Sequence, residues 1–307
     1  MSIGDSTRPW RIKRVAQLDS LLSPLSSPIV PNLKEVPNHF PIIIAAYLQE
    51  QLIGVLVTHF YPIVYSAKVQ LLWLITAFEK NPILIQDLFS ALEAELQREK
   101  CRIVICHYLQ EHPDTPQLQS LLAKNQWHGF DLLEVRSFYA ALLFNPPWFK
   151  KRYSIPPDWT LFPWKDLSPQ EKEKLKQEES NYQFPSHVSP LAIPEESIEP
   201  INSLGVRYKN RVVGWMITQR SAPDLIQYSA LYLEKDLHPI GIAIQLVREA
   251  VLRQQMANIP RAYIQVNIRQ VHLSWRHFLQ KKLLPYADTV THIQQCWHVL
   301  GETTGCN

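Results

Sequence analysis

The chain has 307 residues, a length that fits two domains of ordinary size, and 46% of them are apolar, which allows a core in each. The formal net charge of +3 is too small to indicate binding to nucleic acid or to an anionic membrane surface. The chain begins with polar residues and holds no apolar run long enough to span a bilayer, so the sequence predicts a soluble, cytoplasmic protein with no membrane partner.

The first half of the sequence predicts strands that alternate with helices. Two apolar runs joined by a polar turn at 49–51 predict a hairpin of buried strands. Pro82 is expected to open a helix, because the missing N–H of proline costs nothing in a first helical turn. The expected elements are a strand, short helix and loop within 10–40, strands at 42–48, 52–60 and 69–78, a helix from Pro82 through Leu96, a strand at 102–107, a helix at 115–126 and a strand at 135–144.

A proline-rich segment at 146–159 predicts an interdomain linker. Tryptophans around it are expected to form an aromatic patch between the two halves; they are Trp148, Trp159 and Trp164. Beyond it, Ser168 and Glu171 have the spacing of a capping box. The elements expected in the second half are helices at 168–181, 240–255 and 271–282 and strands at 204–208, 211–220, 225–233, 261–266 and 291–300.

Two stretches about 160 residues apart share one pattern. Residues 46–58 and 206–218 each form a hairpin signal followed by glycine, three apolar residues and threonine. A repeat of this length indicates two copies of one domain. The order of strands and helices in each copy predicts an α/β fold with a mixed sheet and helices on both faces, divided into domains at 1–145 and 160–307.

The second copy contains a glycine at the predicted start of a helix. The segment reads His238-Pro239-Ile240-Gly241-Ile242-Ala243 and follows an apolar strand. Small residues let a ligand approach the backbone, and the N–H groups and dipole of a helix N-terminus favour negative charge. The segment is therefore a candidate site for a diphosphate.

This segment resembles the motif [QR]-x-x-G-x-[GA] of the GNAT superfamily of acyl-CoA N-acyltransferases. Gly241 and Ala243 match the motif, whereas His238 stands where the family prefers Gln or Arg and Pro239 where Gly is common. The preceding strand has its apolar residues at the family's positions, and a later strand ends on an asparagine as in the family; these residues are Leu231, Leu233 and Asn267. The resemblance covers 160–300 by element order and 225–280 by motif.

The resemblance implies that acetyl-CoA is a co-substrate and that a primary amine attacks its thioester directly. The diphosphate would contact main-chain amides at the helix start, and the pantetheine arm would lie between two separated strands. The implied binding residues are Leu231, Leu233, His238, Ile240, Gly241, Ile242, Ala243 and Asn267. Catalysis would combine alignment, polarisation of the thioester carbonyl and proton removal.

The residues that would handle protons depart from the family pattern. Family members often place a tyrosine seven residues after the asparagine, near the leaving thiolate, and Ser274 stands there in this chain. Tyr228, on the strand before the motif, is the candidate base, with Ser229 as a second candidate acting through water. No spacing of His, Cys, Asp or Glu indicates a metal site.

The first copy lacks the glycine of the motif. Leu84 replaces it, and the preceding loop is two residues shorter. A branched side chain there is expected to block the path of a diphosphate, so the first copy is expected to serve as a scaffold, to shape the acceptor cleft or to bind a protein partner.

Two other functions remain open. The departures at His238, Pro239 and Ser274 motivate a catalytically inactive pair of GNAT-like domains that acts as a binding or assembly module. Transfer from aminoacyl-tRNA, as in Fem-type tandem relatives, is disfavoured by the weak positive charge and the absence of a coiled-coil insertion in the sequence.

Overall fold

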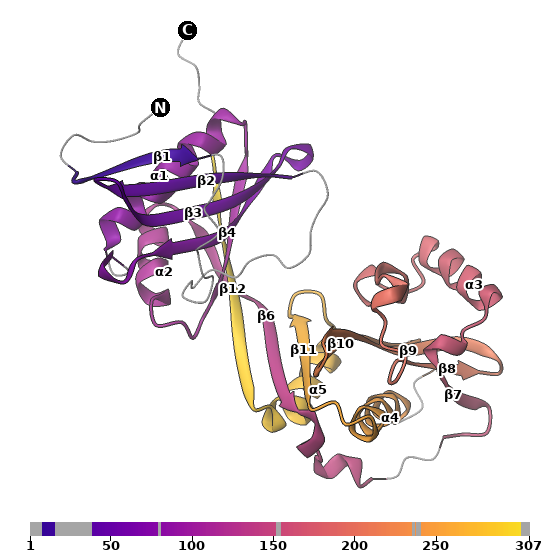
Figure 1. The fold of residues 1–307 in the computed structure, drawn as a ribbon. Coiled ribbons are helices and arrows are strands. Elements are labelled where there is room, and N and C mark those ends of the chain that lie inside the picture. Colours follow the sequence, from indigo (N-terminus) through magenta and orange to yellow (C-terminus); the bar gives the residue numbers. More distant parts are fainter. Residues whose placement is uncertain are drawn as a thin grey trace. The chain divides into compact units, whose positions relative to one another are not determined.

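The computed structural model describes residues 8–15, 39–78, 81–151, 155–234, 237 and 241–301. The chain forms two compact units (Figure 1), which are Met1–Leu133 with Thr291–Asn307 and Glu134–Val290. We call them unit 1 and unit 2 and describe each by itself.

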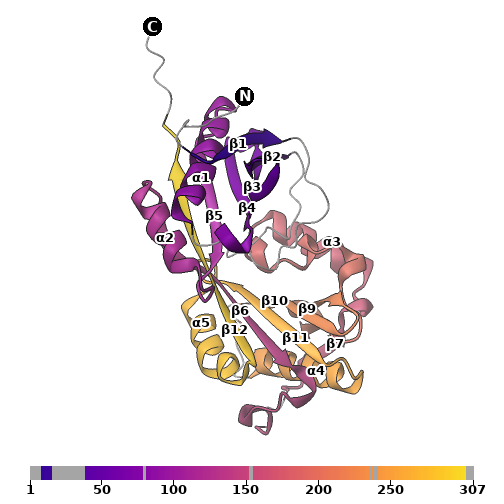
Figure 2. The ribbon, with the colours of Figure 1, turned by 60° about the vertical axis from the view of Figure 1, so that its left-hand side comes forward.

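Unit 1 is a mixed sheet with two helices packed on one face (Figure 2). The strand order is β1-β2-β3-β4-β5-β12, in which only β4 and β5 are parallel. Its elements are β1 (Trp10–Val15), β2 (Phe40–Leu48), β3 (Gln51–Tyr61), β4 (Ser66–Leu74), α1 (Pro82–Arg98), β5 (Ile103–Leu109), α2 (Thr115–Lys124) and β12 (Thr289–Val299). Leu88, Leu92 and Leu96 of α1 are fully buried at helical spacing, so this face of the helix closes the core.

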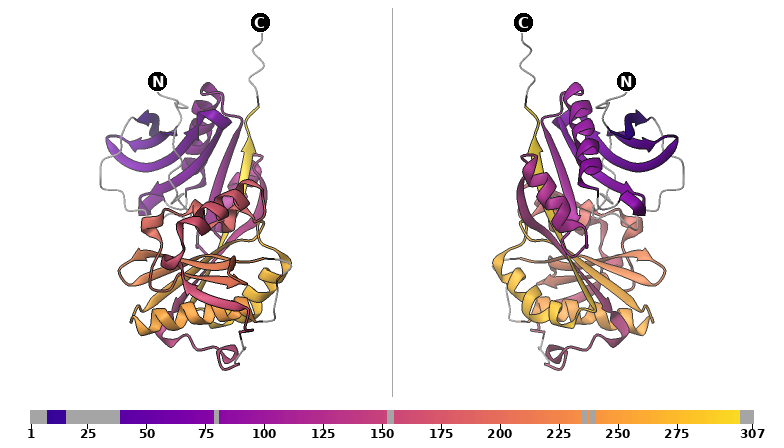
Figure 3. Two further views of the ribbon diagram at one scale, coloured as in Figure 1. Left: turned by 90° about the vertical axis from the view of Figure 1, so that its right-hand side faces the viewer. Right: turned by 90° about the vertical axis from the view of Figure 1, so that its left-hand side faces the viewer.

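Unit 2 has the corresponding strand order β6-β11-β10-β9-β8-β7, with β10 and β11 as its parallel pair. Its elements are β6 (His128–Ala140), β7 (Trp159–Pro163), α3 (Pro169–Ser180), β8 (Leu204–Tyr208), β9 (Arg211–Ala222), β10 (Leu225–Leu233), α4 (Ile242–Met256), β11 (Arg261–Asn267) and α5 (Leu273–Phe278). α4 and α3 cover opposite faces of the sheet (Figure 3), and each face has its own apolar core.

Short helical turns connect these elements. They are η2 (Pro62–Val64), η3 (Thr76–Phe78), η4 (Ala141–Leu143), η5 (Pro147–Phe149), η6 (Trp164–Asp166), η7 (Ser186–Val188), η8 (Pro190–Ala192), η9 (Glu195–Ser197), the π-helical turn η10 (Leu279–Leu283) and η11 (Leu284–Tyr286).

Each unit contains the last strand of the other half of the sequence. β6 follows the helices of unit 1 but pairs antiparallel with β11 of unit 2. β12 ends the second half but pairs antiparallel with β5 of unit 1, with Cys296 opposite Cys106. The compact units therefore differ from the division at 1–145 and 160–307, because one strand from each half belongs to the other unit.

The predicted fold class is confirmed: both units are mixed α/β layers, and both predicted hairpins form. The capping box also forms, with the Glu171 amide donating to Ser168 Oγ at 3.2 Å and the Ser168 amide to Glu171 Oε2 at 2.9 Å. The helix predicted at 271–282 changes to a π-helical turn after Phe278. The short helix expected within 10–40 lies outside the described residues.

The tryptophans near the predicted linker do not form a patch between two halves. Trp148 and Trp159 are buried in the core under α4, and Trp164 is buried in the core under α3, so all three belong to unit 2. The segment after β6 thus packs into unit 2, where the Trp148 indole donates to the Lys282 carbonyl at 3.0 Å.

Across the described ranges, no helix has the length and apolar character needed to cross a membrane.

Candidate functional site

The parallel strands β10 and β11 separate part of the way along unit 2. Their pairing begins with Leu225 opposite Arg261 and ends with Tyr228 opposite Ile264. β10 then continues to Leu233 along β9, while β11 continues along β6. On its β11 side, β10 therefore has no strand partner beyond Tyr228 among the described residues, and we call this separation of the two strands the gap. Leu231 and Leu233, both half-buried, lie on this separated part.

A β-bulge marks the point of separation. β10 pairs with β9 through Tyr228 opposite Thr218 and then through Ala230 opposite Ile217, so Ser229 is the extra residue. A bulge bends the strand that carries it and strengthens its local twist. The bend turns β10 away from β11 immediately after their last paired residues.

Unit 1 has the same bulge and the same separation. β4 pairs with β3 through Val69 opposite Thr58 and then Leu71 opposite Val57, so Gln70 is the extra residue. The parallel pairing of β4 with β5 also ends at Val69, after four paired residues that begin at Ser66. The sequence repeat is therefore a structural repeat at the level of strand register, in which Val69 corresponds to Tyr228.

In unit 2, no side chain of the described residues caps the helix after the separated strand. Gly241 precedes α4 with a φ of +105°, a conformation that favours glycine, and it has no side chain with which to cap the first amides. Ile242 is buried and Ala243 is half-buried at the start of the helix. The other predicted binding residues of this segment, His238 and Ile240, lie outside the described residues.

The corresponding helix of unit 1 is capped by its own side chain. Asn81 Oδ1 accepts from the amides of Ile83 and Leu84, each at 3.1 Å. The expectation that the Leu84 side chain blocks a diphosphate was wrong, because Leu84 is fully buried in the core under α1. The Asn81 amide oxygen satisfies two N–H groups at the start of α1, which are then not free to bind an anion.

Tyr228 does not face the gap. It is buried, its hydroxyl donates to Gln254 Oε1 at 2.8 Å, and Asn202 Nδ2 lies 3.5 Å from the same oxygen. Burial raises the pKa of Tyr228, so this hydroxyl is a poor group for accepting a substrate proton. The proposal that Tyr228 is a general base is therefore replaced by a structural position in a polar network. Asn202 and Gln254 carry no motif, and their only signal in the sequence is their polarity among apolar neighbours.

The remaining predicted residues occupy the end of β11 and the helix that follows. Asn267 Oδ1 accepts from the Arg269 amide at 3.0 Å, which shapes the turn after β11. Ser274 lies in α5, one residue after its start, and its side chain is outside the described part of the structure. Within that part, no group of three His, Cys, Asp or Glu side chains is placed to hold a metal ion.

Half-buried hydroxyl and amide side chains lie around the gap on the sheet face that points away from α4. Ser229 Oγ donates to Gln219 Oε1 at 2.7 Å, and Gln219 Nε2 donates to Ser197 Oγ at 3.0 Å. On the next strand, the Tyr263 hydroxyl donates to Gln227 Oε1 at 2.8 Å. This face has the hydrogen-bonding groups that a polar acceptor would need.

An ion pair between Glu134 and Arg136 extends this polar face along β6. Glu134 accepts from Gln265 Nε2 and from Arg136 Nε, each at 2.6 Å. The charge of this carboxylate is therefore balanced by the guanidinium of Arg136.

No family model matches the sequence, and no curated protein is similar to it in sequence. Solved structures are similar in fold. A tandem GNAT protein from the clavulanic acid biosynthesis pathway superposes with a TM-score of 0.54 and 11% identity, over 89% of this chain and 85% of that one. A GCN5-related N-acetyltransferase from Sphaerobacter thermophilus has a TM-score of 0.53 and 14% identity, over 84% and 80%.

These similarities extend over both units. The predicted tandem GNAT fold is confirmed, and at this level of identity the similarity establishes the fold alone.

Proposed function

We propose that unit 2 transfers the acetyl group of acetyl-CoA to a primary amine. The observation that carries this proposal is the separation of β10 from β11 after Tyr228 and Ile264, directly before a helix that starts at an uncapped glycine. A gap between parallel strands and a bare helix N-terminus are the two features that a long thioester with a charged diphosphate requires. Unit 1 keeps the gap, but Asn81 caps its helix.

Each part of acetyl-CoA would contact a different part of unit 2. The diphosphate would accept hydrogen bonds from the amides around Gly241, Ile242 and Ala243. The pantetheine arm would pair with the main chain of β10 near Leu231 and Leu233. The thioester would then lie beside the bulge at Ser229, where a main-chain N–H could polarise its carbonyl.

The chemical step is a direct acyl transfer. The amine nitrogen attacks the thioester carbon, the C–N bond forms, and the C–S bond breaks to release the CoA thiolate. The nitrogen loses one proton to a water molecule on the face that holds Ser229, because the hydroxyl of Tyr228 is already bonded inside the protein. Most of the rate enhancement in this scheme comes from alignment of the two substrates.

Calorimetric titration with acetyl-CoA tests the proposal. Gly241→Glu and Gly241→Lys introduce the same backbone strain at a φ of +105° and side chains of similar length but opposite charge. If a diphosphate binds there, the glutamate variant should bind acetyl-CoA at least ten-fold more weakly than the lysine variant. Equal affinities in two folded variants would contradict this site.

The same titration decides between the transferase and the binding or assembly role. Saturable binding by the unaltered protein, with release of CoA on addition of an amine library, supports the transferase. Absence of binding at millimolar acetyl-CoA favours a catalytically inactive pair of GNAT-like domains that acts as a binding or assembly module.

A further inference from the structure

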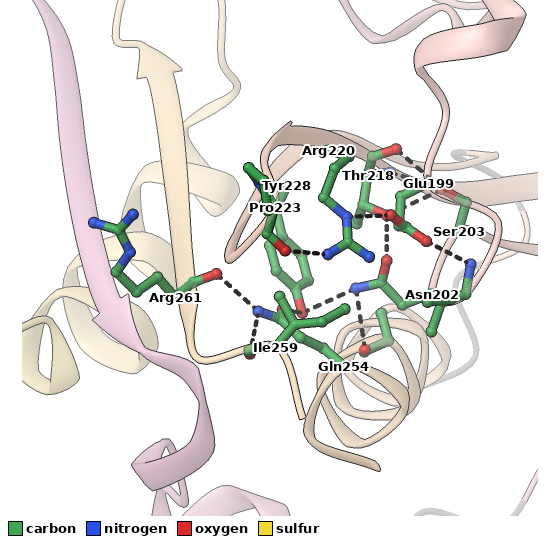
Figure 4. Close-up of polar contacts among 12 residues, drawn as sticks. Glu199, Asn202, Ser203, Thr218, Arg220, Pro223, Tyr228, Gln254, Ile259 and Arg261 are labelled. Carbon is green, nitrogen blue, oxygen red and sulfur yellow. Dashed lines mark hydrogen bonds and ion pairs between the residues drawn. The ribbon is translucent and has the colours of Figure 1, made fainter. Parts of the chain in front are cut away.

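Unit 2 contains a buried polar network under the separating strands (Figure 4). Its members Asn202, Thr218 and Gln254 have no exposed surface, and Tyr228 is 7% exposed. Gln254 is the centre on the α4 side: its Oε1 accepts from the Tyr228 hydroxyl, and its Nε2 donates to the carbonyls of Ile259 at 3.1 Å and Arg261 at 2.9 Å. The network thus joins the end of α4 to β10 and to the start of β11.

Asn202 extends the network toward β9. Its Nδ2 donates to the Ala250 carbonyl of α4 at 3.3 Å, and its Oδ1 accepts from the Thr218 hydroxyl at 2.5 Å. Ser203, also fully buried, donates to the Thr218 carbonyl at 3.2 Å and accepts from the Thr218 amide at 3.0 Å. Every side-chain nitrogen and oxygen of these residues has a partner among the described residues.

Unit 1 has apolar residues where unit 2 has the centre of this network. Val69 stands at the place of Tyr228, opposite a threonine and directly before the bulge. Leu96 stands at the place of Gln254, since its carbonyl accepts from the amide of Cys101 as that of Gln254 accepts from Ile259. Both Val69 and Leu96 are fully buried in the core.

Unit 1 indicates that this fold can form without the polar network. Unit 1 forms the bulge and the strand separation with an apolar core beneath them. The fold therefore does not need the polar network, and burying polar groups is costly unless all of them are paired. The network occurs in the unit whose helix start is uncapped.

The position of Tyr228 indicates what the network holds. Tyr228 is the last residue of β10 that pairs with both neighbouring strands, and the unpaired edge toward β11 begins after it. Hydrogen bonds constrain both distance and angle, whereas the hydrophobic effect has no preferred direction. The hydrogen bonds of the Tyr228 side chain therefore restrain the main chain of β10 at the point where β10 and β11 separate.

We infer that Asn202, Tyr228 and Gln254 are positioning residues that hold the edge of β10 in register for the pantetheine arm of the acyl donor. The inference rests on the proposed function for its ligand. None of the three contacts the reacting atoms; they act through the main chain of residues 229–233.

Two probes separate this role from general stability. Acetyl-CoA would use both the helix start and the edge of β10, whereas adenosine 3′,5′-bisphosphate has no pantetheine and would use only the helix start. The double variant Tyr228→Phe with Gln254→Leu introduces apolar groups resembling those of unit 1. It should weaken acetyl-CoA binding at least five-fold and change bisphosphate binding less than two-fold. The matched control Leu96→Val perturbs the same place in unit 1 and should change neither affinity.

Hydrogen exchange without ligand gives an independent readout. Amides of residues 229–233 should exchange at least ten-fold faster in the double variant, while those of residues 70–74 in unit 1 keep their rates. The single variant Tyr228→Phe removes only one hydroxyl, so it should show a smaller loss of acetyl-CoA affinity and a smaller rise in exchange at 229–233. This variant keeps the test valid if the double variant does not fold.

The outcomes distinguish the two proposals. Unchanged exchange at 229–233, or equal weakening of both probes, overturns the positioning role and leaves the transferase proposal standing. Absence of acetyl-CoA binding by the unaltered protein overturns both proposals together.

Discussion

Thr58 and Thr218 lie at the same register position, each opposite the residue that precedes a bulge, but only the hydroxyl of Thr218 is hydrogen-bonded. Both side chains are fully buried. Thr218 Oγ1 donates to Asn202 Oδ1, whereas Thr58 Oγ1 has no partner among the described residues. Unit 1 thus keeps a polar group whose counterpart in unit 2 belongs to a network.

This difference predicts opposite effects of one substitution. Thr58→Val removes an unsatisfied buried hydroxyl at nearly constant shape and should raise the free energy of unfolding by about 1 kcal/mol. Thr218→Val breaks the bond to Asn202 and should lower that free energy by about 1–3 kcal/mol. Urea denaturation of the two variants measures both values, and equal changes in the two units would contradict the difference in bonding.

The hydrogen bonds of Glu171 are expected to make the free energy of unfolding depend on pH in the acidic range. Hydrogen bonds from Arg207 at 2.6 and 3.0 Å, with those from Ser168, lower the pKa of Glu171 to about 2 from its ordinary 4.5. A lowered pKa in the folded state means that this stabilisation is present above pH 4.5 and is lost as the pH falls toward 2. Glu171→Gln should therefore destabilise the protein at pH 7 and lose its effect in that acidic window.

The matched control for this measurement is Glu173→Gln on the same helix. Glu173 is largely exposed, and its carboxylate pairs with Lys176 at 3.4 Å. An exposed pair of this kind contributes little, so its replacement should leave the unfolding free energy nearly unchanged from pH 7 to pH 2. If the free energies of unfolding of the wild type and Glu171→Gln differ by the same amount at every pH, the ionised carboxylate of Glu171 is not the cause of the difference.

Gly129→Ala should loosen the exchanged strand β12. A Cβ at this position would lie 1.5 Å from Cζ3 of the Trp297 indole, and the φ of +70° is itself unfavourable for alanine. The indole must move, so the substitution should destabilise the protein by about 3 kcal/mol. Gly54→Ala is the milder comparison, because its closest atom is the flexible Cδ2 of Leu74 at 2.7 Å. Thermal unfolding and hydrogen exchange in β12 measure the effect.

Asn81→Ala tests how much the N-cap of α1 contributes to stability. Loss of the cap to the amides of Ile83 and Leu84 should lower the unfolding free energy by about 1 kcal/mol. Asn81→Asp keeps the acceptor oxygen and adds a charge that the helix dipole favours, so its stability should equal or exceed that of the wild type. A stable Asn81→Ala protein would mean that the cap contributes nothing.

Much of the fold could be predicted because its signals are local. The repeat at 46–58 and 206–218 gave two hairpins in matching register, and Gly54 pairs with Leu74 as Gly214 pairs with Leu233. Proline at the start of α1 and the capping box of α3 are also local, and both form as expected.

The features that were not predicted depend on distant contacts. Nothing in the types of Gln70 and Ser229 marks them as bulge residues, because a bulge is a property of two paired strands. The exchange of β6 and β12 cannot be predicted from the sequence, because either strand could complete either unit by its local pattern. The strand position of Tyr228 suggests catalysis, and only its tertiary contact with Gln254 reveals its actual surroundings.

The exchange of closing strands constrains how the protein is made. β5 receives β12 as its neighbour, and β12 is translated about 180 residues after it. During synthesis, unit 1 therefore leaves the ribosome with the edge of β5 open and with Cys106 not yet covered by Cys296. Such an edge is a template for mispairing with another nascent chain. A gene cut between the two halves should give two aggregation-prone fragments, which regain native strand pairing only when they are expressed together.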